Sequence, residues 1–206
     1  WWLYVSNLNF WVLVLTAGYV FVAPILAMGC YEGGHILEQG QRPALRRLLL
    51  VRAAFRQDVA YLGLALLMIY FTWAGLAQIV YGTSTYQLFK SVPELVAFAV
   101  GTPDGLNMLA IGSIIGGIMA YFTFAFVVVS APMLLNPQAN IFSATAASFN
   151  AVTHNPMSLT IWAAIIALFI LVAAMSGFLL LIVIFPWLGL ASWRAYRELV
   201  PDTYRR

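Results

Sequence analysis

A long stretch without charge dominates this chain. No Asp, Glu, Lys or Arg occurs from Gly105 to Trp193, and His154 is the only side chain there that titrates near neutral pH. A hydrocarbon core about 30 Å thick needs roughly 20 apolar residues for each helical crossing. The stretch is therefore long enough for three crossings and the links between them, and it belongs in lipid.

The composition of the whole chain also indicates a protein embedded in lipid. Of 206 residues, 63% are hydrophobic and 8% are charged, whereas ordinary soluble domains are about 25% charged. We predict an all-α fold, a polytopic transmembrane helical bundle in which residues 1–206 form a single transmembrane domain. A dispersed net charge of +3 does not favour nucleic acid as a partner, and the single cysteine, Cys30, excludes an intrachain disulfide.

Five spans are predicted from the apolar runs. The final run, Met157 to Leu199, would be about 65 Å long as one helix, twice the membrane thickness, so a tight hairpin is expected at Ser176 and Gly177. Because the chain starts at Trp1 with aromatic residues typical of an interface, we also expect a sixth span upstream. The five spans are residues 8–30, 59–81, 105–131, 157–175 and 178–196.

Two or three interfacial amphipathic helices are expected between the spans. After the first span, Gly33, Gly34 and Gly40 are expected to loosen the chain, and a basic helix in the headgroup region is expected from Pro43 to Gln57. A short apolar segment from Pro93 to Val100 is expected to rest on the membrane surface.

The last interfacial helix is predicted within 133–155, with its end at Asn155 and Pro156. Helical spacing there places four apolar residues on one face, namely Ile141, Phe142, Phe149 and Val152.

The basic residues set the predicted orientation. With five spans, the segment from Arg42 to Arg56 and the tail with Arg194, Arg197, Arg205 and Arg206 lie on the same side of the membrane. The positive-inside rule places that side in the cytoplasm, so we predict a multi-pass protein of the bacterial inner membrane with cytoplasmic basic loops and C-terminus.

Small residues and prolines are the most pointed features within the spans. Gly112 with Gly116, offset by Ser113 with Gly117, predicts a face on which another helix packs closely, from this chain or from a partner. Helix kinks are predicted at Pro24, Pro132 and Pro186.

The sequence shows no catalytic motif. No ionisable residue lies deep in a predicted span, whereas coupled transporters usually keep such residues there. His35 and His154 could pair as haem ligands, but locally bonded histidines are the preferred interpretation. We therefore expect no enzyme activity, no cofactor and no metal.

Several phrases along the chain resemble a family of uncharacterised bacterial integral membrane proteins, some of whose members are labelled cytochrome c oxidase subunits. The phrases are 22–32, with its Ala-Pro pair, 102–105, 129–135, 154–156 and 185–196. The resemblance covers nearly the whole chain and implies no catalytic residue. This chain has Asn136, Gln138 and Asn140 where the family often carries acidic residues.

Two functions remain as hypotheses. The first is a non-catalytic accessory subunit of an energy-transducing membrane complex, such as a haem-copper oxidase or a related respiratory or photosynthetic assembly, with other membrane-protein subunits and lipids as partners. The second is a permease or channel for a neutral or lipid-like solute, because helices broken at Pro24 and Pro132 could line a pathway.

Overall fold

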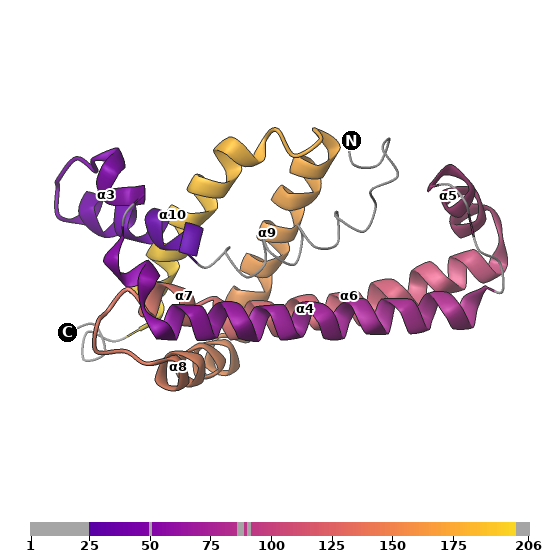
Figure 1. The fold of residues 1–206 in the computed structure, drawn as a ribbon, viewed down its shortest axis with the longest axis horizontal. Coiled ribbons are helices and arrows are strands. Elements are labelled where there is room, and N and C mark those ends of the chain that lie inside the picture. Colours follow the sequence, from indigo (N-terminus) through magenta and orange to yellow (C-terminus); the bar gives the residue numbers. More distant parts are fainter. Residues whose placement is uncertain (1–24, 50, 86–88, 90–91, 201–206) are drawn as a thin grey trace. The chain divides into compact units, whose positions relative to one another are not determined.

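The computed structural model describes residues 25–49, 51–85, 89 and 92–200. Every regular element in this part of the chain is helical, which confirms the predicted all-α class (Figure 1). Residues 25–38 form the first described helix. It is followed by α3 (Leu45–Leu49), the 3₁₀ helix η1 (Arg52–Phe55), α4 (Gln57–Ser84), α5 (Val92–Gly101), α6 (Pro103–Val127), α7 (Ser130–Met133), α8 (Ile141–His154), α9 (Pro156–Met175) and α10 (Leu181–Leu199).

Three of the described helices are long and apolar enough to cross a membrane. They are α4, α6 continued through α7, and α9, and they coincide with the predicted spans 59–81, 105–131 and 157–175. In their most apolar windows, only 22%, 28% and 11% of the residues are buried within the chain. Most of their apolar surface is thus available to lipid or to other membrane helices.

The other two predicted spans are not among these three. The span predicted at 8–30 lies mostly outside the described residues, although 25–30 are helical. The span predicted at 178–196 is a helix, α10, but Arg194, Arg197 and Glu198 occupy its last turns and shorten its apolar part. The described residues therefore contain three clear spans, and five spans stay a prediction.

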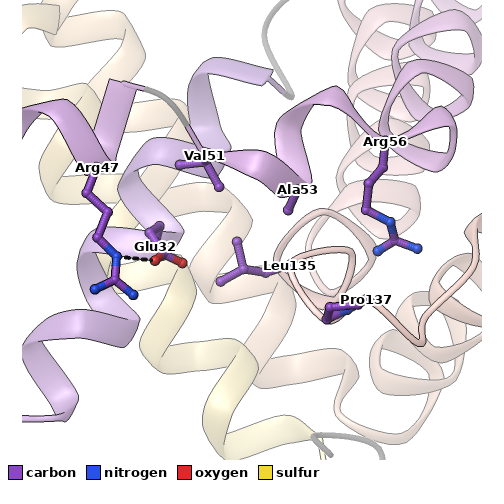
Figure 2. Close-up of a pocket in the computed structure, with 7 residues that line it drawn as sticks. All are labelled: Glu32, Arg47, Val51, Ala53, Arg56, Leu135 and Pro137. Carbon is purple, nitrogen blue, oxygen red and sulfur yellow. Dashed lines mark hydrogen bonds and ion pairs between the residues drawn. The ribbon is translucent and has the colours of Figure 1, made fainter.

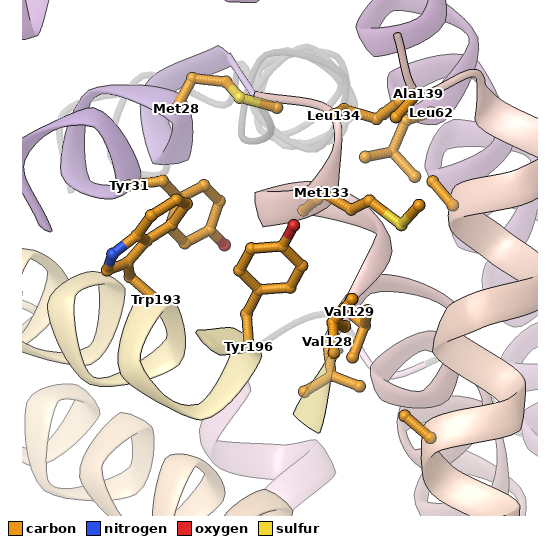
Figure 3. Close-up of a cluster of buried hydrophobic side chains, with 14 of the residues drawn as sticks. Met28, Tyr31, Leu62, Val128, Val129, Met133, Leu134, Ala139, Trp193 and Tyr196 are labelled. Carbon is orange, nitrogen blue, oxygen red and sulfur yellow. The ribbon is translucent and has the colours of Figure 1, made fainter. Parts of the chain in front are cut away.

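Contacts divide the chain into two compact units, each described by itself. The larger unit ends at Leu66 and resumes at Phe124, and the smaller unit is Leu67–Thr123. In the larger unit, α7 packs against α8 and α10, and α9 packs against the same two helices. Figure 3 shows part of its core, where Tyr31, Met133, Trp193 and Tyr196 come together from three helices.

Glycines set the distance between helix 25–38 and α10. A Cβ at Gly34 would stand 2.6 Å from the Trp193 indole, and a Cβ at Gly189 would collide with the Cys30 side chain. Each glycine therefore accepts a neighbouring side chain into the space where its own would be. The expectation that Gly33 and Gly34 loosen the chain is wrong, because the helix runs through both of them and uses them for packing.

Helix 25–38 ends in a Schellman motif at Gly40. The Gly40 N–H donates to the Leu37 carbonyl at 3.0 Å, and the Gln41 N–H donates to the Ile36 carbonyl at 3.2 Å. Gly40 has φ +70°, the left-handed conformation that glycine adopts without a Cβ penalty. Of the three glycines expected to loosen this segment, only Gly40 ends a helix.

The basic segment after Pro43 is not one amphipathic helix, contrary to prediction. It consists of α3 and η1, and the backbone is extended at Val51 (φ −71°, ψ 119°) and at Arg56 (φ −77°, ψ 148°). Val51 and Ala54 are buried in the core of the larger unit. Because this segment folds into the unit, it does not keep one uniform polar face toward the headgroups.

The predicted helix before Pro156 is α8, which begins with a capping box between Asn140 and Ser143 and ends at His154. Its predicted apolar face is partly wrong. Phe142 is 84% exposed, whereas the small residues Ala144 and Ser148 are fully buried. Small residues lie inward because α8 packs closely against α7.

The hairpin predicted at Ser176 and Gly177 is confirmed. Helix α9 ends at Met175, and the left-handed residues Gly177 (φ 62°) and Phe178 (φ 66°) reverse the chain. The Ser176 hydroxyl donates to the Ala173 carbonyl and accepts the Leu180 N–H, which closes the turn. Helix α10 begins at Leu181, three residues later than predicted, because the turn uses the intervening residues.

In the smaller unit, residues 102–105 form the start of α6, close to where the third span was predicted to begin. Thr102 accepts the Gly105 N–H at 3.0 Å as an N-cap, and Pro103 occupies the first helical position. A Cβ at Gly105 would collide with the Phe98 carbonyl, so only glycine allows α5 and α6 to meet this closely. The surface segment predicted at 93–100 is the helix α5.

The glycine contacts predict opposite effects for two similar substitutions. Gly34→Ala should lower the free energy of unfolding by about 1–3 kcal/mol, because the added methyl overpacks the Trp193 contact. Gly75→Ala should be neutral or raise it by up to about 1 kcal/mol, because Gly75 faces open space on α4 and alanine is the better helix former. Unfolding in mild detergent measures both, and equal effects would contradict the packing described here.

Candidate functional site

The guanidinium of Arg56 is the centre of the polar end of the larger unit. It donates to the backbone carbonyls of Leu134, Asn136 and Ala139 at 3.1, 2.7 and 2.8 Å, and to Asp58 Oδ2 at 3.1 Å. These carbonyls belong to the irregular turn between α7 and α8. One side chain thus satisfies three backbone acceptors that no helix provides for.

Asp58 extends this arrangement to the start of α8. Its Oδ1 accepts the Ile141 N–H at 3.0 Å, while its Oδ2 accepts from Arg56. The Arg56 and Asp58 side chains are 25% and 23% exposed, so water only partly screens the pair. The first turn of α4 is therefore bonded to the first turn of α8 through one carboxylate.

The amides at 136–140 have structural roles. The Asn136 Oδ1 accepts the Gln138 N–H at 2.9 Å, and the Asn140 side chain caps α8. An uncharged amide suits this turn because the three carbonyls already accept from a cation that is paired with Asp58. The resemblance stressed acids at these positions, but the bonds described here need none.

Ser148 holds a break between α6 and α7. Its hydroxyl is fully buried, donates to the Ala125 carbonyl at 2.7 Å and accepts the Val129 N–H at 3.1 Å. Pro132 follows the break and has no N–H to donate to the carbonyl four residues earlier. Ser148 therefore replaces a backbone bond inside an apolar environment, where an unpaired group is costly. Sequence reasoning missed this residue because its partners are about twenty positions away.

Helix kinks were also predicted at Pro186 and Pro24. Pro186 lies inside α10, which continues on both sides of it. Pro24 lies outside the described residues.

Ion pairs link helix 25–38 to arginines of α3 and α10 at this end. Glu38 pairs with Arg197 at 3.2 Å and with Arg194 at 3.9 Å, so helix 25–38 is linked to the end of α10. Arg47 of α3 donates its Nε to Glu32 at 3.1 Å. Each of these three arginines is more than a third exposed, so the pairs contribute little stability but define which segments lie together.

A half-open groove of about 580 Å³ lies beside the Arg47–Glu32 pair (Figure 2). Its walls come from three segments, and Figure 2 shows Arg47 and Arg56 at opposite ends of it. The lining combines two arginines and one carboxylate with an apolar floor: Glu32, Arg47, Val51, Ala53, Arg56, Leu135 and Pro137. It is an amphipathic groove with an arginine at each end, and each arginine is paired with a carboxylate.

The two histidines are bonded locally, as preferred from the sequence. His35 Nε2 is 2.9 Å from Gln39 Nε2 on the same helix, and its ring meets the edge of Trp193. His154 Nδ1 lies 2.9 Å from the Asn150 carbonyl, one helical turn earlier. Within the described segments, no three His, Cys, Asp or Glu side chains are grouped so as to hold a metal ion.

The small residues of α6 divide between two faces in the smaller unit. A Cβ at Gly112 would lie 3.9 Å from Val80, and one at Gly116 would lie 3.6 Å from Trp73, so this pair faces α4. Ser113 and Gly117 are exposed, and a Cβ at Gly117 would meet nothing within 4 Å. The two offset pairs were predicted to form one packing face. Instead, one pair faces α4 and the other pair is exposed.

Two close helix contacts of the larger unit were not predicted from the sequence. They lie at Gly34 and Gly189, where an added Cβ would meet Trp193 and Cys30. Only the partner residues, Trp193 and Cys30, reveal them.

Apolar spanning helices joined at a polar end define an integral membrane protein. A family model described as predicted integral membrane protein (DUF2189) matches residues 12–136, which is more than half of the chain, and the chain belongs to that family. This confirms the resemblance to a family of uncharacterised integral membrane proteins. No curated protein and no solved structure gives a significant match.

Loss of the Arg56 guanidinium should destabilise the larger unit. Arg56→Ala should lower the free energy of unfolding by about 2–4 kcal/mol, because three carbonyls and Asp58 each lose one donor. Arg56→Lys should recover only part of this, since an ammonium lacks the planar fork.

The matched control is Arg46→Ala, an exposed arginine of α3, with a change below about 0.5 kcal/mol. Thermal unfolding in mild detergent compares the three variants. Equal stability of Arg56→Ala and Arg46→Ala would contradict the role given to Arg56.

Proposed function

We propose that this protein is a non-catalytic accessory subunit of a bacterial inner-membrane energy-transducing complex. Its spans pack against neighbouring subunits and lipids. The hydrogen bonds and ion pairs of its polar end hold the spans in place. The observation that carries the proposal is the exposed small-residue face of α6. Gly112 and Gly116 already serve α4, which leaves Ser113 and Gly117 free to receive a helix from outside the chain.

The surroundings of Gly117 support a helix as its neighbour. Ile114 and Ile118 flank it and are each 64% exposed. A glycine between two large apolar side chains forms a notch, and in lipid such a notch favours close helix packing because lipid tails alone fill it poorly. A respiratory or photosynthetic complex is the class of partner that the resemblance suggests.

The proposed topology has five spans, with the basic clusters in the cytoplasm. Its support is a parity argument. The Glu38–Arg197 pair brings the segment before α4 and the end of α10 to the same end, so the chain between them crosses an even number of times. Three spans are clear from length and apolar character, and α10 supplies the fourth. The fifth is the predicted span at 8–30.

Cysteine labelling tests this topology. In a Cys30→Ala background, Arg46→Cys should react with a membrane-impermeant maleimide only after permeabilisation. Met175→Cys, at the 89% exposed end of α9, should react from outside intact cells. Labelling of both positions from the same side would refute the four crossings between the basic clusters.

Substitution of Gly117 tests the subunit proposal. Gly117→Leu fills the notch and should reduce co-purification of partner membrane proteins at least tenfold after solubilisation in mild detergent. Gly75→Leu is the matched control, because it adds the same side chain at an open helical glycine of α4 and should leave co-purification within about twofold.

Three results would count against this proposal. They are equal recovery of partners with both variants, a wild-type protein that purifies alone as a monomer, or protein-dependent flux of a neutral solute in reconstituted vesicles. The last would favour the permease hypothesis instead.

A further inference from the structure

The groove beside Arg47 is part of a longer hollow. A second hollow of about 360 Å³ shares Glu32, Arg47, Leu135 and Pro137 with the first, and it continues toward Trp193 and Arg197. Together they form one elongated groove at the polar end of the larger unit. Helix 25–38 bounds it on one side, and the turn after α7 bounds it on the other. We propose that this groove binds the headgroup of an anionic phospholipid, with its phosphate at Arg47.

Arg47 has the free donors that a phosphate requires. Its Nε donates to Glu32, and none of the described residues accepts from its two terminal amino groups. The side chain is 57% exposed. A guanidinium with one edge held and the other open is preorganised for a phosphate, because two parallel N–H groups match two phosphate oxygens.

Arg56, at the opposite end of the groove, has a different role. Its amino groups already donate to three carbonyls and to Asp58. It therefore forms a wall of the groove and holds the turn that lines it. Arg42 and Arg46, both exposed on the same basic segment, contribute a positive potential near the groove.

The apolar part of the lining distinguishes a lipid from a free anion. Between the two arginines, the groove is lined by Val51, Ala53, Leu135 and Pro137. A small inorganic anion gains nothing from such surface, whereas the glycerol and upper acyl region of a lipid does.

The position of the groove also fits a lipid. Arg56 immediately precedes α4, the first clear span in the described residues, so the groove lies at the end of a spanning helix. Headgroup phosphates are found at that depth, where arginine is favourable.

A binding measurement tests this proposal independently of any partner subunit. The full chain in a neutral mild detergent is titrated with phosphatidylglycerol, phosphatidylcholine or inorganic phosphate, and bound lipid is counted by native mass spectrometry. Phosphatidylglycerol should bind at least tenfold more tightly than phosphatidylcholine. Inorganic phosphate at millimolar concentration should not displace it.

Three variants make the test specific to Arg47. Arg47→Gln should weaken phosphatidylglycerol binding at least tenfold, whereas Arg46→Gln, which removes the same charge from the next residue outside the groove, should weaken it less than threefold. Glu32→Gln should tighten binding, because it removes the carboxylate that competes for Arg47. A tighter complex cannot be explained by misfolding.

Several outcomes would overturn the proposal. Equal losses for Arg46→Gln and Arg47→Gln would show diffuse attraction by the basic segment. Displacement by inorganic phosphate would show an anion site without lipid selectivity. Weaker binding by Glu32→Gln would show that the bound phosphate does not lie at Arg47, because removal of the neighbouring carboxylate can only favour an anion there.

Discussion

The polar end of the larger unit depends on the hydrogen bonds of the Arg56 guanidinium. Four backbone or carboxylate acceptors from the α7–α8 turn and the start of α4 meet at this one side chain. A turn at the end of spanning helices has carbonyls that no helix satisfies, and where they are shielded from water they need donors from the protein. Arg56 supplies them, and Asp58 passes the connection on to α8. The groove that we assign to a lipid exists because this turn is held in place.

A second constraint is close approach between helices. The hydrophobic effect contributes little to helix association inside a membrane. Helix packing there depends on small residues and on polar groups that are hydrogen-bonded. Gly34 and Gly189 let helix 25–38 and α10 approach each other, and Ser148 bonds α8 to the break after α6. These contacts join segments that are far apart in sequence. The contacts at Gly34 and Gly189 accompany the pairing of Glu38 with Arg194 and Arg197, and that pairing supports the proposed topology.

Hydropathy and length were sufficient to predict the three clear spans and the hairpin at Ser176 and Gly177, because lipid imposes those features locally. Contacts between distant segments were not predictable in this way. Arg56 meets carbonyls 78 to 83 residues away, and nothing in its neighbourhood marks it among five arginines. The apolar face expected on α8 failed at Phe142, because packing selected small residues for the inner side. Gly34, expected to loosen the chain, instead packs against Trp193, a residue far from it in sequence.

The pairing of helix 25–38 with the end of α10 can be measured directly. In a Cys30→Ala background, Glu38→Cys and Arg197→Cys are introduced together, and native membranes are treated with a short bifunctional thiol reagent. The structure predicts an efficient intramolecular cross-link, because these side chains form an ion pair at 3.2 Å. Absence of the cross-link, while each cysteine alone reacts fully with the monofunctional reagent, would show that the two basic clusters do not share one end.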